Sequence, residues 1–276
     1  MQRSEICIVA VILFASVIAL VACNENDRDE RRAGASNAVS SQQATAQKPA
    51  EKPNTEEEEE GEEGPAVPPA VAGEKPAPLQ VSGKQFIYNF DSDPPGQLPS
   101  KFHTAKTGGG SPEKWSVQSD SSAPSQPNVV TQTSTDQTDY RFPLLISDEG
   151  SFQDVDLSVK FKAISGSVDR AGGLVFRLKD ANNYYIVRAN ALENNYRMYH
   201  VVSGRRSQFA GANFKITSGE WHELRVEAVG NKIAYYYDGN KKIEATDSTF
   251  KDAGKVGLWT KADSVTYFDD LKVMAK

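Results

Sequence analysis

Two pairs of carboxylates lie close enough in the sequence to suggest acid–base chemistry. Hydrolysis of a glycosidic bond uses two carboxyl groups that face one bond, and residues two or four apart on a strand share a face. Asp154 and Asp156 have this spacing, but Asp154 precedes the alternating stretch that starts at Asp156. Glu223 and Glu227 lie in WHELRVEAV, opposite its apolar residues. A solvent-exposed polar face explains these glutamates, so we predict no catalytic carboxylate pair.

Histidine chemistry has little support in the sequence. His103, His200 and His222 are the only histidines, no two of them have the spacing of a metal site, and the chain contains no Gly-x-Ser-x-Gly motif. We expect His103 in a loop and His200 on a strand, packed or at the surface. The sequence therefore predicts neither a catalytic Ser-His-Asp triad nor a zinc site.

A binding face is better supported, because aromatic and planar polar side chains share faces of several expected strands. Aromatic rings stack on the apolar faces of sugars, and Arg, Asn and Lys donate hydrogen bonds to hydroxyl groups. The alternative is a solvated sheet face on which these side chains only pack against each other. The predicted ligand-binding residues are Arg177, Tyr184, Arg188, Asn190, Trp259 and Lys261.

The elements that must position these residues are β-strands. In DLSVKFKA the apolar residues alternate with polar ones, and GLVFRLK places Leu174, Phe176 and Leu178 on one face and Arg177 on the other. Turn residues such as Asp238-Gly239 separate the strands, and no stretch has a convincing helical period. An all-β sandwich or jelly roll is predicted. The expected strands are 85–90, 115–118, 129–133, 156–163, 173–179, 183–191, 195–202, 221–229, 232–237, 255–260 and 265–273.

Three stretches resemble a known superfamily. They are AGGLVFRLKDANNYYIVRANALENNYRMYHVVSGRR, WHELRVEAVGNKIAYYYDGNK and GKVGLWTKADSVTYFDDLKV. They are similar to the concanavalin A-like lectin/glucanase superfamily, and within it to laminin-G-like and 3-keto-disaccharide-hydrolase-type (DUF1080-like) domains of bacterial envelope proteins. The resemblance covers most of residues 84–276. It implies a jelly roll of twelve to fifteen strands with one concave sheet, on which members of the superfamily commonly bind glycans. The Glu-x-Asp-x-(x)-Glu motif of catalytic glucanases in this superfamily is absent here.

The resemblance also raises the question of a structural calcium ion, since related lectin-like domains often hold one. Asp91 and Asp93 follow the first expected strand, while Asp269 and Asp270 lie in the last. The first and last strands of jelly rolls are often adjacent, and carboxylates are preferred calcium ligands. Asp91, Asp93 and Asp270 are therefore candidate ligands. The alternative, which we prefer, is that Asp91 and Asp93 form Asx-turns before the two prolines that follow.

The N-terminus predicts export and lipidation. An apolar run from Ile6 to Ala22 ends in Leu-Val-Ala-Cys, which resembles the lipobox of bacterial lipoproteins. In that family a signal peptide, here residues 1–22, is removed and the cysteine, here Cys23, carries a diacylglycerol. The alternative is an uncleaved membrane-spanning helix. Since Cys7 lies in the removed segment, the mature protein would keep one cysteine and form no internal disulfide. Asn24 favours the outer membrane if the envelope is Gram-negative.

Residues 23–83 are predicted to be a disordered tether. They are rich in Ala, Pro, Ser, Gln and Glu, and include an unbroken run from Glu56 to Glu60. Such a segment cannot bury enough apolar surface to offset its ordering entropy. Residues 24–83 hold 13 acidic and 6 basic side chains, whereas residues 84–276 hold 23 and 24. The acidity thus belongs to the tether, which we interpret as a spacer rather than a site for cations or basic partners. An acidic, extended chain argues against nucleic-acid binding, which would call for a basic patch.

These observations predict a lipid-anchored, carbohydrate-binding protein of the cell envelope that is monomeric and non-catalytic, with a structural calcium ion as its one candidate cofactor. Two alternatives remain open. One is a glycoside hydrolase of the 3-keto-disaccharide type, which acidic or histidine side chains converging beside Arg177 and Arg188 would favour. The other is a structural or protein-interaction lipoprotein, which a flat face filled by its own side chains would favour.

Overall fold

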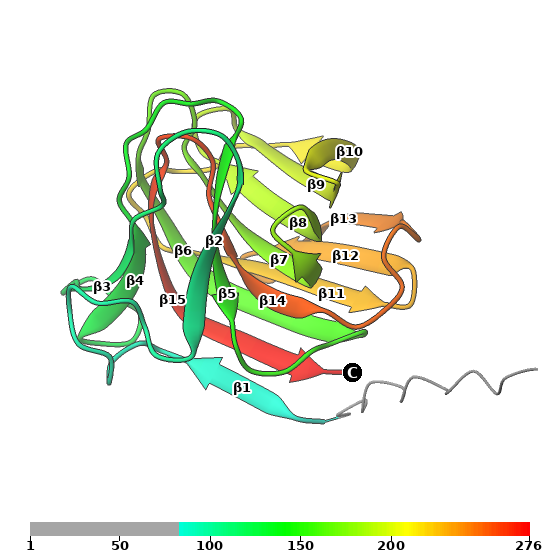
Figure 1. Ribbon diagram of the computed structural model, residues 1–276, viewed down its shortest axis with the longest axis horizontal. Coiled ribbons are helices and arrows are strands. Elements are labelled where there is room, and N and C mark those ends of the chain that lie inside the picture. Colours follow the sequence, from blue (N-terminus) through cyan, green and yellow to red (C-terminus); the bar gives the residue numbers. More distant parts are fainter. Residues whose placement is uncertain (1–82) are drawn as a thin grey trace, which may run out of the picture. The chain divides into compact units, whose positions relative to one another are not determined.

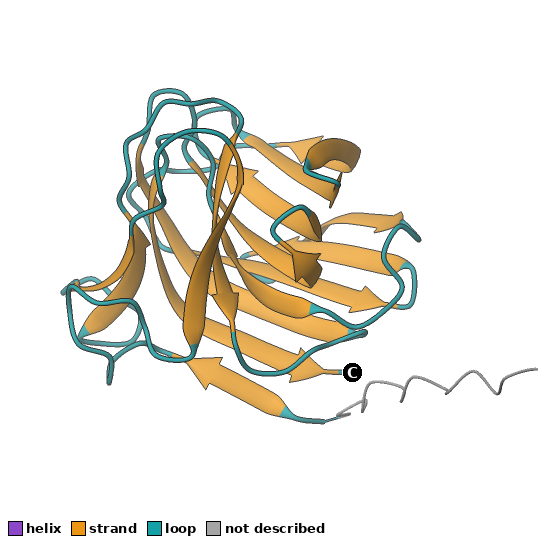
Figure 2. Cartoon of the chain, in the orientation of Figure 1, coloured by secondary structure: helices purple, strands orange, loops and turns teal. Residues whose placement is uncertain are grey.

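The computed structural model describes residues 83–276, which fold as a sandwich of two antiparallel sheets (Figure 1). Figure 2 shows strands and loops and no helix in this part of the chain. The predicted all-β sandwich is confirmed, and its fifteen strands fall within the expected range. The proposed signal peptide, Cys23 and the tether lie outside the described residues. Within residues 83–276, no helix is long and apolar enough to span a membrane.

One sheet has eight strands, in the order β13-β12-β11-β6-β15-β4-β3, with β1 also paired to β15. The first and last strands of the domain are therefore neighbours, as expected from the jelly-roll resemblance. The strands of this sheet are β1 (Gln85–Tyr88), β3 (Trp115–Ser119), β4 (Asn128–Gln132), β6 (Val155–Ser165), β11 (His222–Val229), β12 (Lys232–Tyr237), β13 (Asn240–Thr246) and β15 (Val265–Ala275).

The second sheet has seven strands, in the order β10-β9-β8-β7-β14-β5-β2. Its strands are β2 (Phe102–Gly108), β5 (Arg141–Ser147), β7 (Ala171–Asp180), β8 (Asn183–Asn190), β9 (Asn195–Val202), β10 (Arg205–Asn213) and β14 (Lys255–Trp259). The chain crosses from the eight-stranded to the seven-stranded sheet between β13 and β14, through residues 247–254.

Period-two alternation builds the core between the two sheets. In β6, Leu157, Val159 and Phe161 are buried in this core, while Lys160 and Lys162 lie on the other face and are partly exposed. The same alternation holds in β11. Burial of a large apolar side chain contributes about 1.5–3 kcal/mol, so this shared core is the main stabilising feature of the domain.

The seven-stranded sheet also buries its outer face. A second apolar cluster covers this face, whereas Leu145, Tyr185 and Leu258 from the same strands point into the core between the sheets. A strand buried on both sides has an unbroken apolar sequence, as in FPLLI of β5 and YYIV of β8. We call this set the outer apolar cluster; its largest members are Phe142, Leu144, Ile146, Leu178, Tyr184, Ile186, Tyr199 and Trp259.

A bulge in β7 turns one more apolar side chain into the outer apolar cluster. The pairing of β7 with β8 shifts register between Phe176 and Asp180, and Arg177 has a left-handed φ of 47°. Leu178 therefore joins the outer apolar cluster, and our prediction that it shares a face with Leu174 and Phe176 was wrong.

The end of the β7–β8 hairpin then contacts β2. The hydroxyl of Thr107 in β2 donates to the carbonyl of Ala181 and shares a hydrogen bond with the hydroxyl of Tyr184 at 2.8 Å. Three strands separate β8 from β2 in the sheet, so this contact requires the hairpin end to bend across the outer face.

Four strands were not predicted. Two of them, β10 and β13, are polar strands at sheet edges, so their residues lack an alternating apolar face. The other two, β2 and β5, lie next to each other in the seven-stranded sheet. His103 consequently lies in β2 and not in a loop. The apolar run of β5 contains Pro143, which normally argues against a strand inside a sheet.

A buried carboxylate holds the loop between β3 and β4. Asp269 of β15 is fully buried and accepts hydrogen bonds from the amide and hydroxyl of Ser125, at 2.8 and 2.9 Å, and from the amide of Asp270. Burial raises the pKa of Asp269 to about 6, although these hydrogen bonds oppose the shift.

This raised pKa predicts a specific pH dependence of stability. Between about pH 4 and pH 6 the Asp269 carboxyl ionises in the unfolded chain but stays protonated in the folded one. Its contribution to the free energy of unfolding should therefore fall as the pH rises through this window, by up to about 3 kcal/mol, and then level off. Urea unfolding at pH 4 and pH 6.5 should show a smaller difference for Asp269→Asn than for the unaltered protein. Equal differences would contradict the assignment.

Candidate functional site

Five of the six predicted ligand-binding residues lie on the outer face of the seven-stranded sheet, and Arg177 does not join them. Two of the five are fully buried members of the outer apolar cluster, and the other three are polar. The apolar pair packs in the middle of the face, while the polar three meet near the turn between β8 and β9 and the segment after β14. The five residues are Tyr184, Arg188, Asn190, Trp259 and Lys261.

The polar side chains form a connected network, which we call the Arg188 cluster. The ammonium group of Lys261 lies 2.5 Å from an oxygen of Asp139 and 2.9 Å from an oxygen of Asp169. The guanidinium of Arg188 lies 3.1 Å from Glu193. The cluster consists of Asp139, Asp169, Arg188, Asn190, Glu193 and Lys261.

Local structure fixes the acidic members of this cluster. Asp263, in the turn after β14, accepts hydrogen bonds from the three successive amides of residues 167–169 and so positions Asp169. Asn190 donates to Asp169 at 2.7 Å, and its oxygen accepts from the amide of Glu193 at 3.2 Å. The loop before β7 and the turn after β8 are thereby held in a single arrangement.

Exposure divides the cluster into an inner and an outer part. The side chains of Asp139 and Glu193 are 73% and 42% exposed, while those of Lys261 and Arg188 are 10% and 5% exposed. Asp169 is fully buried. Carboxylates are therefore the groups that this site exposes to solvent, and each of them forms an ion pair with a buried cation.

The charges of the cluster support one another. Burial would raise the pKa of Glu193, but hydrogen bonds from Asn195 and Arg188 outweigh burial and lower it. Burial would lower the pKa of Lys261, but Asp139 and Asp169 raise it. Burial raises the pKa of Asp169, and Arg188 and Lys261 oppose this shift.

Sequence analysis missed Arg206, which extends the site. Its guanidinium carbon lies 4.4 Å from the ring centroid of Tyr199 and 4.6 Å from that of Phe142, within cation–π range. Buried nitrogens of Arg206 (Nη1) and Arg188 (Nε) have no hydrogen-bond partner among residues 83–276. Such donors are normally satisfied by water or a ligand. Arg206 was missed because β10 was not predicted, and Asp139 and Asp169 carry no local signal because they reach the site from distant loops.

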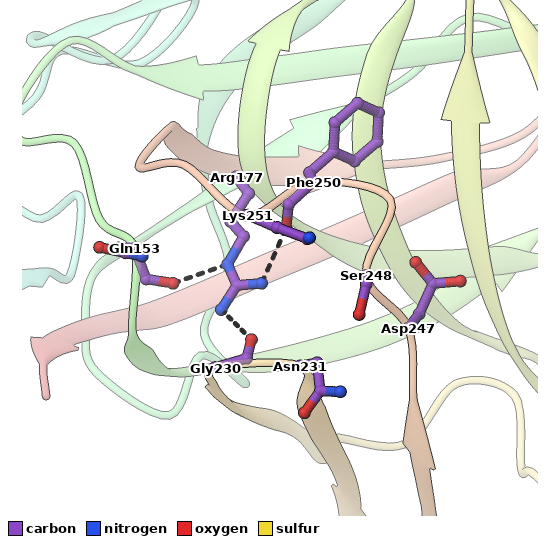
Figure 3. Close-up of a pocket in the computed structure, with 8 residues that line it drawn as sticks. All are labelled: Gln153, Arg177, Gly230, Asn231, Asp247, Ser248, Phe250 and Lys251. Atoms are coloured by element: carbon purple, nitrogen blue, oxygen red, sulfur yellow. Dashed lines mark hydrogen bonds between the residues drawn. The ribbon is translucent and has the colours of Figure 1, made fainter.

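Arg177 lies in a different place, at a pocket of about 330 Å³ (Figure 3). It is 1% exposed, and its guanidinium donates to the carbonyls of Gln153, Gly230 and Phe250 and to the carboxylate of Asp154. These bonds join three chain segments, so Arg177 acts in the structure as a clamp between them.

The carboxylate pairs considered above are engaged in ion pairs. Asp156 accepts two hydrogen bonds from Arg225, each at 2.6 Å. Glu223 lies 3.1 Å from Lys160, and Glu227 lies 2.9 Å from the side chain of Lys276. Asp154 is bound to the Arg177 clamp.

Each histidine is paired with an aspartate. His103 contacts Asp148 at 2.5 Å, and His222 contacts Asp238 at 2.9 Å. His200 contacts Asp247 at 3.1 Å. Within residues 83–276, no three His, Cys, Asp or Glu side chains form a group that could hold a metal ion.

The candidate calcium ligands have other contacts. Asp91 accepts from the amide of Asn128 at 3.0 Å, and Asp93 accepts from the amide of Ser100 at 2.9 Å. Asp270 lies at the β15 bulge with a φ of 48°. A structural calcium ion at Asp91, Asp93 and Asp270 stays a prediction. The Asx-turns that we preferred for Asp91 and Asp93 are not formed, because both carboxylates accept from amides of residues distant in sequence.

Comparison with known proteins assigns the family. Residues 102–274, more than half of the chain, match the 3-keto-alpha-glucoside-1,2-lyase-like domain. The chain belongs to this family. The lyase-like domain is also 31% identical over 104 residues to the levanase of Bacillus subtilis (strain 168). That match takes in 37% of this chain and 15% of the levanase, so the chain spans only a small part of that enzyme.

Solved structures show the fold of the lyase-like domain. The carbohydrate binding module CBM66 from Bacillus subtilis is 22% identical with a TM-score of 0.50, over 62% of this chain and 94% of the module. The GH43 protein BlXynB from Bacillus licheniformis is 16% identical with a TM-score of 0.50, over 69% of this chain and 39% of BlXynB. The expected concanavalin A-like jelly-roll fold is confirmed.

The Arg177 clamp gives a stability prediction. Arg177→Leu would leave three carbonyls without their donor and Asp154 without its cationic partner, so the free energy of unfolding should fall by about 3–5 kcal/mol. The matched change Arg205→Leu, at an exposed arginine, should alter it by less than about 0.5 kcal/mol. Urea unfolding of both variants checks this, and similar stabilities for the two would show that Arg177 is not a structural clamp.

Proposed function

We propose that this protein is a lipid-anchored, non-catalytic carbohydrate-binding protein of the cell envelope, and that it binds a neutral sugar at the Arg188 cluster. The observation that carries this proposal is the exposure of Asp139 and Glu193 in front of buried Lys261 and Arg188. Carboxylates held in this way are fixed acceptors for sugar hydroxyl groups, and a neutral ligand avoids repulsion by them.

Apolar side chains flank the exposed carboxylates. Tyr140, next to Asp139, is 43% exposed, and Leu192, next to Glu193, is 42% exposed. The Tyr140 hydroxyl donates to the carbonyl of Gly204, which holds the side chain against the β9–β10 turn. A fixed aromatic ring beside hydrogen-bond acceptors suits a sugar, which has both apolar and hydroxyl-bearing surfaces.

The electrostatics of the cluster favour binding over hydrolysis. A general acid must hold a proton near neutral pH, and Arg188 and Asn195 lower the pKa of Glu193. Asp169, whose pKa is raised, is fully buried behind Lys261 and cannot contact a substrate in this arrangement.

The named relatives suggest the first ligands to test. One is a levanase by name and another is a carbohydrate binding module. Levan is therefore a sensible first probe among neutral polysaccharides.

The anchoring part of the proposal rests on the sequence. Residues 1–22 and Cys23 fit a lipoprotein signal, and residues 24–83 fit a spacer. We propose a monomer held at the envelope by lipid on Cys23, in the outer membrane if the cell is Gram-negative.

Cleavage of a 3-keto-glycoside is a second candidate function, favoured by a specific observation. Glu193, an exposed carboxylate, lies 3.1 Å from the guanidinium of Arg188 in a domain whose family is described as lyase-like. A structural role is the third candidate function, because the rest of the outer face is filled by its own apolar side chains. One test that measures both binding and product release can distinguish the three functions.

The test is a binding screen of the full chain against neutral polysaccharides, including levan, with long incubations analysed for product. Glu193→Gln and Asp139→Asn should each weaken binding about tenfold, because each removes a charged acceptor. Glu244→Gln, an exposed ion-paired glutamate on the other sheet, is the matched control and should bind normally.

Three results would overturn the proposal. Release of product by the unaltered chain would establish an enzyme. Binding that is unchanged in both variants would place the ligand elsewhere, and the absence of both binding and product would favour the structural role.

A further inference from the structure

The pocket at Arg177 shares no residue with the Arg188 cluster and lies at the crossing from β13 to β14. It has a volume of about 330 Å³, near the lower end for ligand pockets, which suits one sugar residue. Figure 3 shows its walls: Gln153 before β6, the Gly230–Asn231 turn between β11 and β12, and residues 247–251 of the crossing. These three segments are distant in sequence.

The pocket is a built structure and not a gap between mobile loops. The guanidinium of Arg177 donates to the carbonyl oxygens of Gln153 at 2.6 Å, Gly230 at 2.7 Å and Phe250 at 2.9 Å. One buried side chain therefore fastens all three walls, as the dashed lines in Figure 3 show. The pocket is thus shaped before any ligand enters, which reduces the entropy lost on binding.

Asp247, which lines this pocket, and Asp154, which is bound to Arg177, already accept several hydrogen bonds. Asp247 accepts from the hydroxyl of Tyr185 at 2.5 Å and from the amide of Thr249 at 2.8 Å, and its second oxygen contacts His200. Asp154 accepts from Arg177 and from the amide of Gly230. Their acceptor capacity is largely used within the protein.

Donors, in contrast, remain available. The side chains of Asn231, Ser248 and Lys251 line the pocket, and they make no hydrogen bond or ion pair with other residues of the described domain. Figure 3 shows Asn231 and Ser248 across the pocket from Gln153. The pocket thus offers an ammonium group, an amide and a hydroxyl as hydrogen-bond donors.

We infer that this pocket is a second sugar-binding site, selective for an acidic sugar residue whose carboxylate binds Lys251 and Ser248. A carboxylate on a sugar ring satisfies unpaired donors and a free cation, and charge-assisted hydrogen bonds are stronger than neutral ones. The chemistry is the reverse of that at the Arg188 cluster, where carboxylates face the solvent. A single chain would then bind two different units of a mixed polysaccharide.

The test compares methyl glucuronoside with methyl glucoside, which differ only by a carboxylate in place of a hydroxymethyl group. Calorimetric titration of the full chain should show binding of the glucuronoside at least about tenfold tighter than that of the glucoside. Lys251→Gln and Ser248→Ala should each weaken glucuronoside binding, about tenfold for the lysine. Lys215→Gln, at an exposed lysine outside the pocket, is the matched control and should have no effect.

The variants also separate this inference from the proposed function. Glu193→Gln should leave glucuronoside binding intact, and Lys251→Gln should leave neutral polysaccharide binding intact. Equal affinity for the two glycosides, or glucuronoside binding that Lys251→Gln and Ser248→Ala do not change, would overturn the inference. So would loss of glucuronoside binding in Glu193→Gln, because that result would place the acidic sugar at the Arg188 cluster.

Discussion

Burial of both faces of the seven-stranded sheet is the constraint on which the rest of this structure depends. A sandwich needs only its inner faces covered, and here the outer face of one sheet is packed as well. The bulge at Arg177 bends the β7–β8 hairpin over that face, so Leu178 and Tyr184 add to its cover. As a result, the middle of the face is closed by apolar side chains, and the Arg188 cluster lies near its margin.

The charged groups at that margin are arranged from the inside outwards. Asp263 fixes a loop through backbone amides, the loop presents buried Asp169, and Asp169 pairs with Lys261. Lys261 in turn holds exposed Asp139. Each ion is paired with the next, which limits the desolvation cost of placing charge in an apolar setting. A site built in this way has acceptors in fixed positions.

The sequence was sufficient for the fold class and for much of the strand pattern, because alternation in β6 and β11 is a local signal. It also placed Tyr184, Arg188 and Asn190 correctly on one face of β8. It could not separate Arg177 from the other candidates, since the bulge that redirects β7 depends on the carbonyls of three distant segments.

The unbroken apolar runs of β5 and β8 did contain a signal that was not used. Strands of this composition are buried on both sides, which would have predicted a covered outer face. The acidic partners of Arg188 and Lys261 come from loops. Neither hydrophobic periodicity nor a sequence motif indicates there which carboxylates will approach these two side chains.

The pairing of β1 with β15 has a mechanical consequence. Any force transmitted along residues 1–82 enters the domain at β1, whose four residues are hydrogen-bonded to one neighbour only. β15 is also paired along its length with β6, so detachment of β1 would leave the two main sheets intact. The four-residue strand can thus detach first under load and lengthen the chain, while the Arg188 cluster and the pocket at Arg177 keep their shape.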